Sequence, residues 1–256
     1  MMDSTIKTKS YIKTILIIGF WIMVWQIGYI IVGRDLYLPA PFQVFSRLTE
    51  LGAEKAFWTS IMYSVYRVGL GVILSIILGI AVGIISGMND LVYEILNPAM
   101  VAIKSTPVMS FIILALIWFS STNSPIFICF LMCFPLVWTN TVAGIRNVDK
   151  KLLEMAHIYD VSKKQIIKKI YLPSLKPYFV SSSVQALGLG WKVTVAAEVL
   201  SNPRHSIGGN LYAAKAYLDI PGLFAWTITV IGLSYIFEVF FVSLMKKKMG
   251  SHKPHA

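Results

Sequence analysis

The sequence predicts an all-α integral membrane protein with about six transmembrane helices, and three observations support this. Only 14% of the 256 residues are charged and 56% are hydrophobic, whereas a soluble domain has roughly 25% charged residues. Long stretches, such as Thr14–Gly33 and Val68–Asn89, contain no charged side chain. Each is long enough for a crossing, since a helix needs ~20 apolar residues to span a ~30 Å hydrocarbon core. The basic residues are also distributed unevenly.

The remaining spans follow from the same hydrophobic pattern. The uncharged stretch Ser105–Ile145 divides into two crossings at the polar run Ser120–Pro125. The segment Pro41–Tyr66 is too polar to span and predicts an amphipathic helix on the outer surface. The expected spans are Tyr11–Val32, Val68–Met88, Ala99–Phe119, Ile126–Ile145, Tyr178–Leu200 and Pro221–Met245.

Lysine and arginine predict the orientation. The loop 146–176 contains eight of them, the N-terminal tail three and the C-terminal tail four, whereas the loops on the other side contain six. Cytoplasmic loops are enriched in these residues. We therefore expect both termini and the loop 146–176 in the cytoplasm of a bacterium, with the chain crossing the plasma membrane several times. The net charge of +11 thus reports topology, and no nucleic-acid partner is expected.

The large basic loop has the pattern of two short helices. Leu152, Leu153 and Ala156 follow Asp149 at helical spacing, and Asp149 is a favourable N-cap residue. This first helix should end near Tyr159 and Asp160.

The second helix of the loop should begin at Ser162, because Gln165 three residues later completes a capping-box pattern. Pro173 is expected to end it, since proline lacks a backbone N–H. The alternative interpretation is a solvated basic loop held to anionic lipid by its lysines, but that would require no helix–turn–helix pattern.

This loop resembles the "EAA" motif of binding-protein-dependent ABC importer permeases, in which Glu-Ala-Ala is followed at fixed spacing by Gly, Ile and Leu-Pro. The matching residues are Glu154, Ala156, Ile170, Leu172 and Pro173. Met155 replaces the first motif Ala, and Asp160, which follows Tyr159, replaces the Gly. Because Asp tolerates the left-handed conformation better than most residues, the turn is expected to form.

The resemblance extends over nearly the whole chain and is greatest to the nitrate/sulfonate/taurine branch. The other segments that carry it are Leu38–Pro41, Ser64 with Arg67, Gly69–Gly87, Trp118–Phe119, Gly144–Ile145, Val148–Asp149 and Ala197–Glu198. It implies a type I importer, MetI-like permease fold, with residues 1–256 as one transmembrane domain and residues 146–176 as its coupling loop.

The resemblance implies a non-catalytic subunit. A second permease copy would complete the pathway, a separate ATPase would bind ATP and Mg²⁺, and an extracytoplasmic solute-binding protein would deliver a small, anionic solute. The chain itself has no G-x-x-x-x-G-K phosphate loop and no apparent catalytic or metal-ligand set, so no cofactor is expected on it. Cys129 and Cys133 are interpreted as apolar packing residues.

Three charged residues fall within the expected spans, where each costs roughly 2.5–3.5 kcal/mol on insertion scales: Lys192, Glu198 and Glu238. Lys192 and Glu198 are candidates for the translocation path, although their spacing places them about 240° apart on one helix. Glu198 could instead lie at the membrane interface, or contact the partner copy or the binding protein. Lys192 could pair with a carboxylate of the partner copy. An ion-coupled secondary transporter, with both residues as a relay, is the alternative function.

Overall fold

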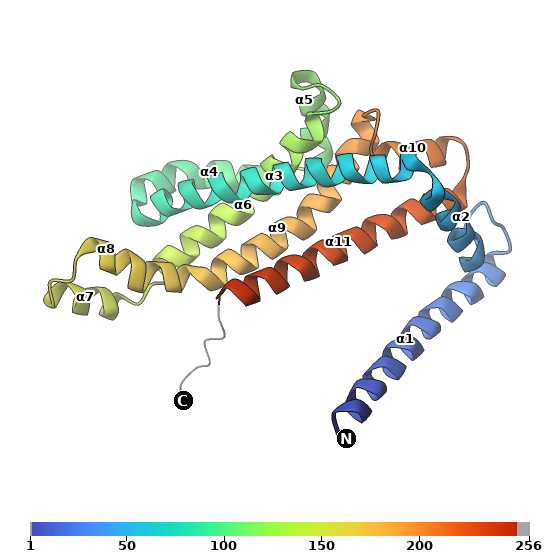
Figure 1. Cartoon of the computed structure of the whole chain (residues 1–256). Helices are drawn as coiled ribbons and strands as arrows, with labels where there is room; N and C mark the ends of the chain where they lie inside the picture. Colours follow the sequence, from blue (N-terminus) through green and yellow to red (C-terminus); the bar gives the residue numbers. More distant parts are fainter. Residues whose placement is uncertain (1, 250–256) are drawn as a thin grey trace. The chain divides into compact units, whose positions relative to one another are not determined.

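The computed structural model describes residues 2–249, and the side chains of residues 13–243. Every regular element within 2–249 is a helix (Figure 1). The helices are α1 Met2–Val32, α2 Pro41–Ala53, α3 Lys55–Met88, α4 Asp90–Ser105, α5 Val108–Trp118, α6 Ser124–Arg146, α7 Lys150–Ile158, α8 Lys163–Ile166, the π-helix η1 Ile167–Tyr171, α9 Leu172–Ser201, α10 Ile207–Ala216 and α11 Ile220–Met249. The side chains of the tail lysines Lys7, Lys9, Lys246, Lys247, Lys248 and Lys253 lie outside the described part.

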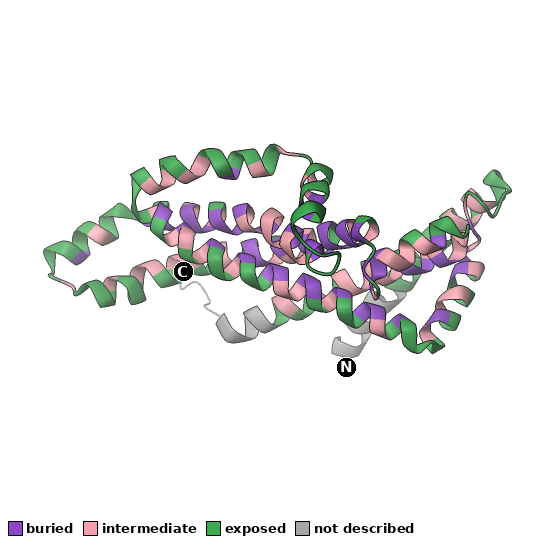
Figure 2. Cartoon of the chain, turned by 90° about the horizontal axis from the view of Figure 1, so that it is seen from above, coloured by how far each residue is buried: buried purple, intermediate pink, exposed green. Residues whose placement is uncertain are grey.

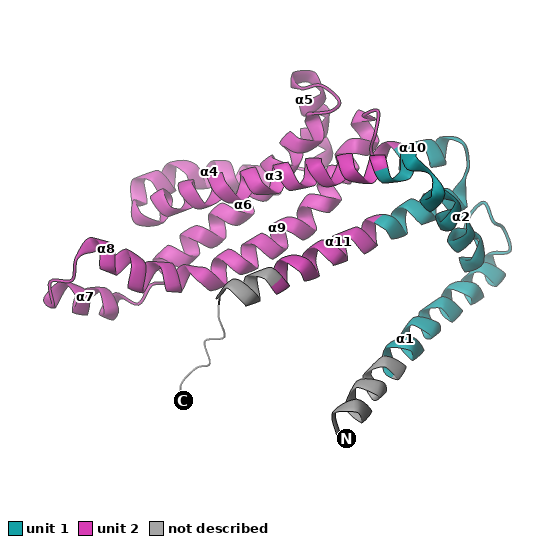
Figure 3. Ribbon diagram, in the orientation of Figure 1, with its two compact units in different colours: residues 1–58, 210–229 teal, residues 59–209, 230–256 magenta. Residues whose placement is uncertain are grey.

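The chain forms two compact units (Figure 3). Unit 1 comprises Met1–Trp58 and Asn210–Thr229, and unit 2 comprises Thr59–Gly209 and Val230–Ala256. Unit 2 contains the loop 146–176 and the charged residues of α9, so most of the candidate functional residues belong to one unit.

Four helical segments in the described part are long and apolar enough to cross a membrane: Lys13–Val32, Lys55–Met88, Ser124–Arg146 and Ile220–Ser243. Helices α4 and α5 together could supply a fifth crossing, but they meet at a bend of 103°. Helix α9 is 30 residues long, yet it is not among the four, because serines and Lys192 dilute its apolar sequence. The chain is therefore a multi-pass membrane protein, with fewer clear crossings than the six expected.

The expected uninterrupted span Ala99–Phe119 is wrong. The chain breaks at Thr106, whose extended backbone (φ −78°, ψ 135°) ends α4. The cause is Pro107, because the ring of a proline disfavours the helical conformation of the residue before it. Helix α5 then begins directly after this proline.

The second membrane helix begins earlier in the chain than the sequence predicts. The amphipathic outer helix ends at Ala53, and α3 starts at Lys55, thirteen residues before the expected Val68. The reason is that the polar residues Ser60, Ser64 and Arg67 lie on one helix face and are buried. Arg67, which is one of the six basic residues counted above in the loops on the outer side, is consequently a residue of α3.

In unit 2, α3 lies unusually close to α6. Three glycines at four-residue spacing face three residues of α6 at the same spacing: Gly79 faces Val137, Gly83 faces Thr141 and Gly87 faces Ile145. A Cβ atom on Gly83 would lie only 2.7 Å from the Cβ of Thr141. Small residues of this kind allow helix backbones to approach within a membrane, where van der Waals packing drives helix association.

Helices α6 and α9 run side by side in unit 2 (Figure 1). Cys129 and Cys133 of α6 are fully buried free thiols. A Cβ on Gly71 of α3 would lie 2.5 Å from the Cβ of Cys129. Both cysteines therefore act as small packing residues, as the sequence suggests.

Candidate functional site: the α7–α8 loop and the charges of α9

The first arm of the loop is helix α7. Asp149 is its N-cap, and the side-chain oxygen Oδ1 accepts a hydrogen bond from the backbone N–H of Lys151 at 2.9 Å. Such a bond satisfies one of the free N–H groups of the first helical turn. The helix ends at Ile158, with Tyr159 as its C-cap, so both ends lie where the sequence predicts.

Asp160 forms the turn between the two arms. Its φ of +47° lies in the left-handed region, so the conformation of the motif glycine is kept by an aspartate. The next residue, Val161, donates its N–H to the carbonyl oxygen of Ala156 at 2.9 Å and closes the turn. The expectation that Asp160 preserves the turn is confirmed.

The tip of the loop exposes apolar side chains. Met155 is 53% exposed, Ile158 80% and Tyr159 75%. Glu154 is also exposed, and its carboxylate has no partner among the described side chains. Ala156, by contrast, is buried, so its small side chain permits close packing within the loop. Figure 2 shows both arms mostly exposed.

The second arm continues into α9. Ser162 is the N-cap of α8, but its side chain makes no capping hydrogen bond. Helix α8 passes through the π-helix η1 into α9, so the expectation that Pro173 ends the arm is wrong. Proline in the first turn of α9 needs no N–H donor, and the wider π-turn before it removes one helical hydrogen bond. Ile170 is half-buried there, and Leu172 is 52% exposed.

An ion pair anchors the base of the loop. Arg146, the last residue of α6, contacts Asp90 of α4, with 2.6 Å between Nη2 and Oδ1. Its guanidinium also lies 4.0 Å from the ring centroid of Tyr93, a cation–π contact. The end of α6, directly before the first arm, therefore contacts α4.

Glu198 is fully buried in a polar network. Its carboxylate accepts hydrogen bonds from Ser64 at 2.8 Å, from Arg67 at 2.8 Å and from the backbone N–H of Gly208 at 3.0 Å. Arg67 also donates to the carbonyl oxygen of His205 at 2.9 Å. All these residues belong to unit 2. Glu198 thus joins α3, α9 and the start of α10, and its charge is compensated within the chain.

Lys192 lies on another face of α9 from Glu198 and is exposed. Its ammonium group makes no hydrogen bond or ion pair with any described residue. Ser181 and Gln185 lie on the same exposed stripe and are hydrogen-bonded to each other at 2.9 Å. The structure therefore separates the two candidate path residues: Lys192 is free to meet a solute or a partner chain, and Glu198 is occupied.

Ser64 and Arg67 were not predicted from the sequence as partners of Glu198. The signal was present, since Ser60, Ser64 and Arg67 recur at i, i+4 and i+7 directly before an apolar run. A single polar stripe on a membrane helix indicates a buried partner of opposite charge.

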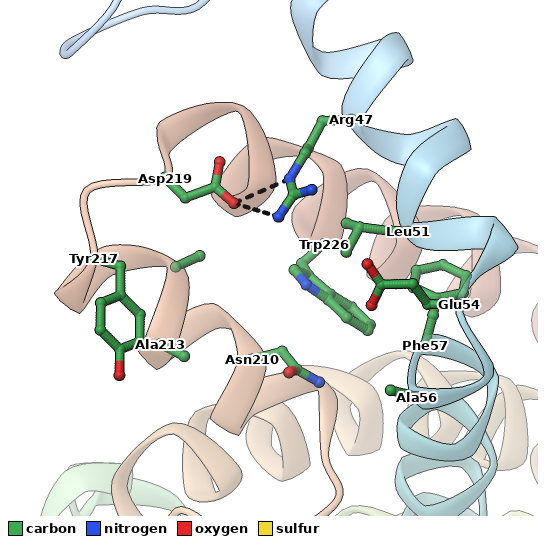
Figure 4. A pocket seen from close by; sticks show the side chains of 11 residues that line it. Arg47, Leu51, Glu54, Ala56, Phe57, Asn210, Ala213, Tyr217, Asp219 and Trp226 are labelled. Carbon is green, nitrogen blue, oxygen red and sulfur yellow. Dashed lines mark hydrogen bonds and ion pairs between the residues drawn. The ribbon is translucent and has the colours of Figure 1, made fainter.

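A separate cavity of about 430 Å³ opens in unit 1 (Figure 4). Arg47 forms its one basic group and is bound by Asp219 at 3.0 Å and by Glu50 at 3.0 Å. These two carboxylates raise the pKa of Arg47. The carboxylate of Glu54, beside the ring of Trp226, has no partner among the described side chains. The described lining therefore carries two carboxylates and one guanidinium, and the guanidinium is paired with Asp219.

The chain is similar to known proteins both in sequence and in fold. Residues 71–249 match the sequence profile of the family described as binding-protein-dependent transport system inner membrane component. The structure is similar to that of the MetNI methionine ABC transporter in inward-facing conformations, with a TM-score of 0.60 and 11% sequence identity over 74% of this chain and 94% of that chain.

Several curated proteins are similar over most of the chain. The putative aliphatic sulfonates transport permease protein SsuC of Bacillus subtilis is 28% identical over 95% of this chain and 88% of its own length. The taurine transport system permease protein TauC of Escherichia coli is 25% identical over 89% and 85%. The nitrate import permease protein NrtB of Synechococcus elongatus is 28% identical over 76% and 73%.

Proposed function

Because this chain belongs to the family of binding-protein-dependent transport system inner membrane components, we propose that two copies of it form the translocation path of an importer for a small anionic solute. A separate ATPase docks on the α7–α8 loop of each copy and supplies the energy. A solute-binding protein delivers the solute from the other side of the membrane. The chain itself contributes no catalytic step.

The exposed tip of the α7–α8 loop carries this proposal. Met155, Ile158 and Tyr159 present an apolar surface that nothing in the described chain covers, and a water-facing apolar surface of this kind indicates a protein partner. Glu154 beside them is a free carboxylate that can pair with a basic group of the ATPase. Movement of the docked ATPase would then be transmitted to the permease through the short helices α7 and α8, which a tight turn connects.

The route from the loop to the path is continuous helix. Helix α8 leads through η1 into α9, so a movement of the second arm reaches α9 with no flexible segment between them. Rigid-body movement of this kind is one way in which a transporter exchanges inward- and outward-facing states.

The solute class follows from the relatives and from Lys192. The three relatives named above carry names for sulfonate, taurine and nitrate transport, and all three of these solutes have an anionic group. Lys192 is an exposed cation on α9, and a single ammonium group can make the weak, reversible contact that a passing anion requires.

The proposal is tested with Glu154→Arg in the native host. We expect normal protein level and membrane insertion, but loss of ATPase co-purification and of ATP-dependent uptake of sulfonate, taurine or nitrate into membrane vesicles. Glu94→Arg, at an exposed carboxylate of α4, is the matched control and should leave both unchanged.

The energy source is tested on the same vesicles. Uptake should survive an uncoupler and stop when ATP is depleted. The opposite pattern, together with normal uptake by Glu154→Arg, would contradict the proposal and favour an ion-coupled transporter.

A further inference from the structure

An apolar groove of about 230 Å³ opens on unit 2 at the end that carries the α7–α8 loop. Its walls include Ile80 and Ile84 near the end of α3, Thr141 near the end of α6, and Leu175 and Phe179 in the first turns of α9. Leu172, the first residue of α9 after η1, also lines the groove. The groove is distinct from the tip on which the ATPase is proposed to dock.

The composition of the groove indicates a hydrocarbon occupant. Ile80 and Ile84 belong to a segment apolar enough to cross the membrane, so water cannot be the stable filling of a groove between them and α9. The walls offer aliphatic and aromatic groups at an open surface. A lipid acyl chain lying beside α3 would exclude water and contact these apolar walls from the open surface.

Lys176 supplies a positive charge beside the apolar walls. It is the only charged residue in the described lining of the groove. It lies in the first turns of α9 and is exposed. Its ammonium group makes no ion pair or hydrogen bond with a described residue. Lysines at the ends of membrane helices extend toward the headgroup region, where the anion that complements Lys176 is a phosphate.

We propose that this groove binds one acidic phospholipid, with an acyl chain along Ile80, Ile84 and Phe179 and the phosphate on Lys176. The inference relies on the membrane location of the chain and not on its cargo or its ATPase. The bound lipid would fill the space beside the junction of η1 and α9, through which movement of the loop reaches the path.

The site is tested on the full chain in phosphatidylcholine nanodiscs that contain a small fraction of phosphatidylglycerol with a photoreactive acyl chain. After illumination, mass spectrometry should locate adducts in the peptides that contain Ile80–Ile84 and Leu175–Phe179. Unlabelled phosphatidylglycerol should compete and unlabelled phosphatidylcholine should not. Adducts spread evenly over the outer surface of the helices, or equal competition by both lipids, would overturn the proposal.

Variants test the phosphate contact and the acyl-chain groove independently. Lys176→Gln should reduce the adducts about fivefold, which corresponds to the attraction of one basic residue to an acidic lipid surface, whereas Lys176→Arg should retain them. Lys164→Gln removes the same charge from the exposed helix α8 and should have no effect. Ile80→Trp should fill the groove and abolish adducts with Lys176 unchanged.

A second copy of the chain is the competing occupant. If Leu175→Cys forms a disulfide between two copies and the groove gives no lipid adduct, the copies cover the groove and the lipid site does not exist. The adduct map of the unaltered chain decides the matter even if a variant fails to fold. The experiment uses neither ATP nor cargo, so its failure is distinguishable from a failure of the proposed function.

Discussion

At the scale of single residues, the buried pair of Arg67 and Glu198 has the largest energetic effect that we can assign. Two charges removed from water are costly unless their remaining hydrogen-bonding positions are also filled. Here Ser64 and the backbone N–H of Gly208 fill those of the carboxylate. On the guanidinium, Nε has no partner in the described chain, so removal of the carboxylate would leave an uncompensated charge.

We expect Glu198→Gln to destabilise the protein by about 3–5 kcal/mol, the usual cost of breaking one side of a buried ion pair. Glutamine can still accept a hydrogen bond, so the loss of stability reports the effect of removing the negative charge alone. Thermal unfolding of the purified chain, followed by tryptophan fluorescence, measures it. Glu238→Gln, at an exposed carboxylate of α11, is the control.

The double variant Arg67→Met with Glu198→Gln should recover part of the lost stability, since no buried charge remains unpaired. Equal unfolding temperatures for Glu198→Gln and Glu238→Gln would contradict the assigned role of the pair. Loss of uptake by a fully stable Glu198→Gln protein would instead restore Glu198 to the translocation path.

Lys192 leads to a different prediction, because it is exposed and unpaired in the described chain. Lys192→Met keeps the length of the side chain and removes its charge. We expect normal assembly and ATPase activity, with uptake of the anion reduced about tenfold, as expected for loss of one charge-assisted contact.

Lys215→Met removes an exposed charge from α10 and is the control for Lys192→Met. Loss of assembly by Lys192→Met would indicate an ion pair with the partner copy. Unchanged uptake would remove Lys192 from the path.

At the scale of helices, the sequence predicts what depends on local chemistry. The α7–α8 turn could be predicted because Asp149, Asp160 and the intervening apolar face determine it locally. The break at Thr106 also has a local cause, the following Pro107, but the uncharged stretch around it hides the boundary when hydrophobicity is the only guide. The continuation of the second arm through η1 into α9, past Pro173, is not determined by local sequence alone, because proline usually ends a helix.

The close approach of α3 and α6 gives a prediction at this scale. Gly83→Ala places a Cβ 2.7 Å from the Cβ of Thr141, so the two helices must separate. We expect a loss of about 1–3 kcal/mol, typical of overpacking, measured by the same thermal unfolding. Gly69→Ala is the matched control, since nothing lies within 4 Å of its added Cβ and alanine is favoured over glycine in a helix. Equal effects of the two changes would contradict tight α3–α6 packing.

At the scale of the whole molecule, the partners of the charged residues could not be predicted from sequence. Arg67 and Glu198 are separated by 131 positions, and no periodicity within one helix links residues so far apart. The orientation, in contrast, follows from a distribution that the whole chain shares, the excess of Lys and Arg in one set of loops. The sequence therefore yields a prediction of the orientation but none of the individual contacts.

The orientation is testable with single cysteines introduced into a chain whose Cys129 and Cys133 are replaced by alanine, which fits the tight space beside Gly71. Lys164→Cys on α8 should be shielded from an impermeant thiol reagent in intact cells and should react after the cells are opened. Arg204→Cys should react in intact cells, because Arg204 is exposed in the segment between α9 and α10. His205 is a poorer position, since its ring stacks on Tyr63 and its carbonyl oxygen binds Arg67. Labelling of position 164 from outside would reverse the orientation and would place the α7–α8 loop where no cytoplasmic ATPase could reach it.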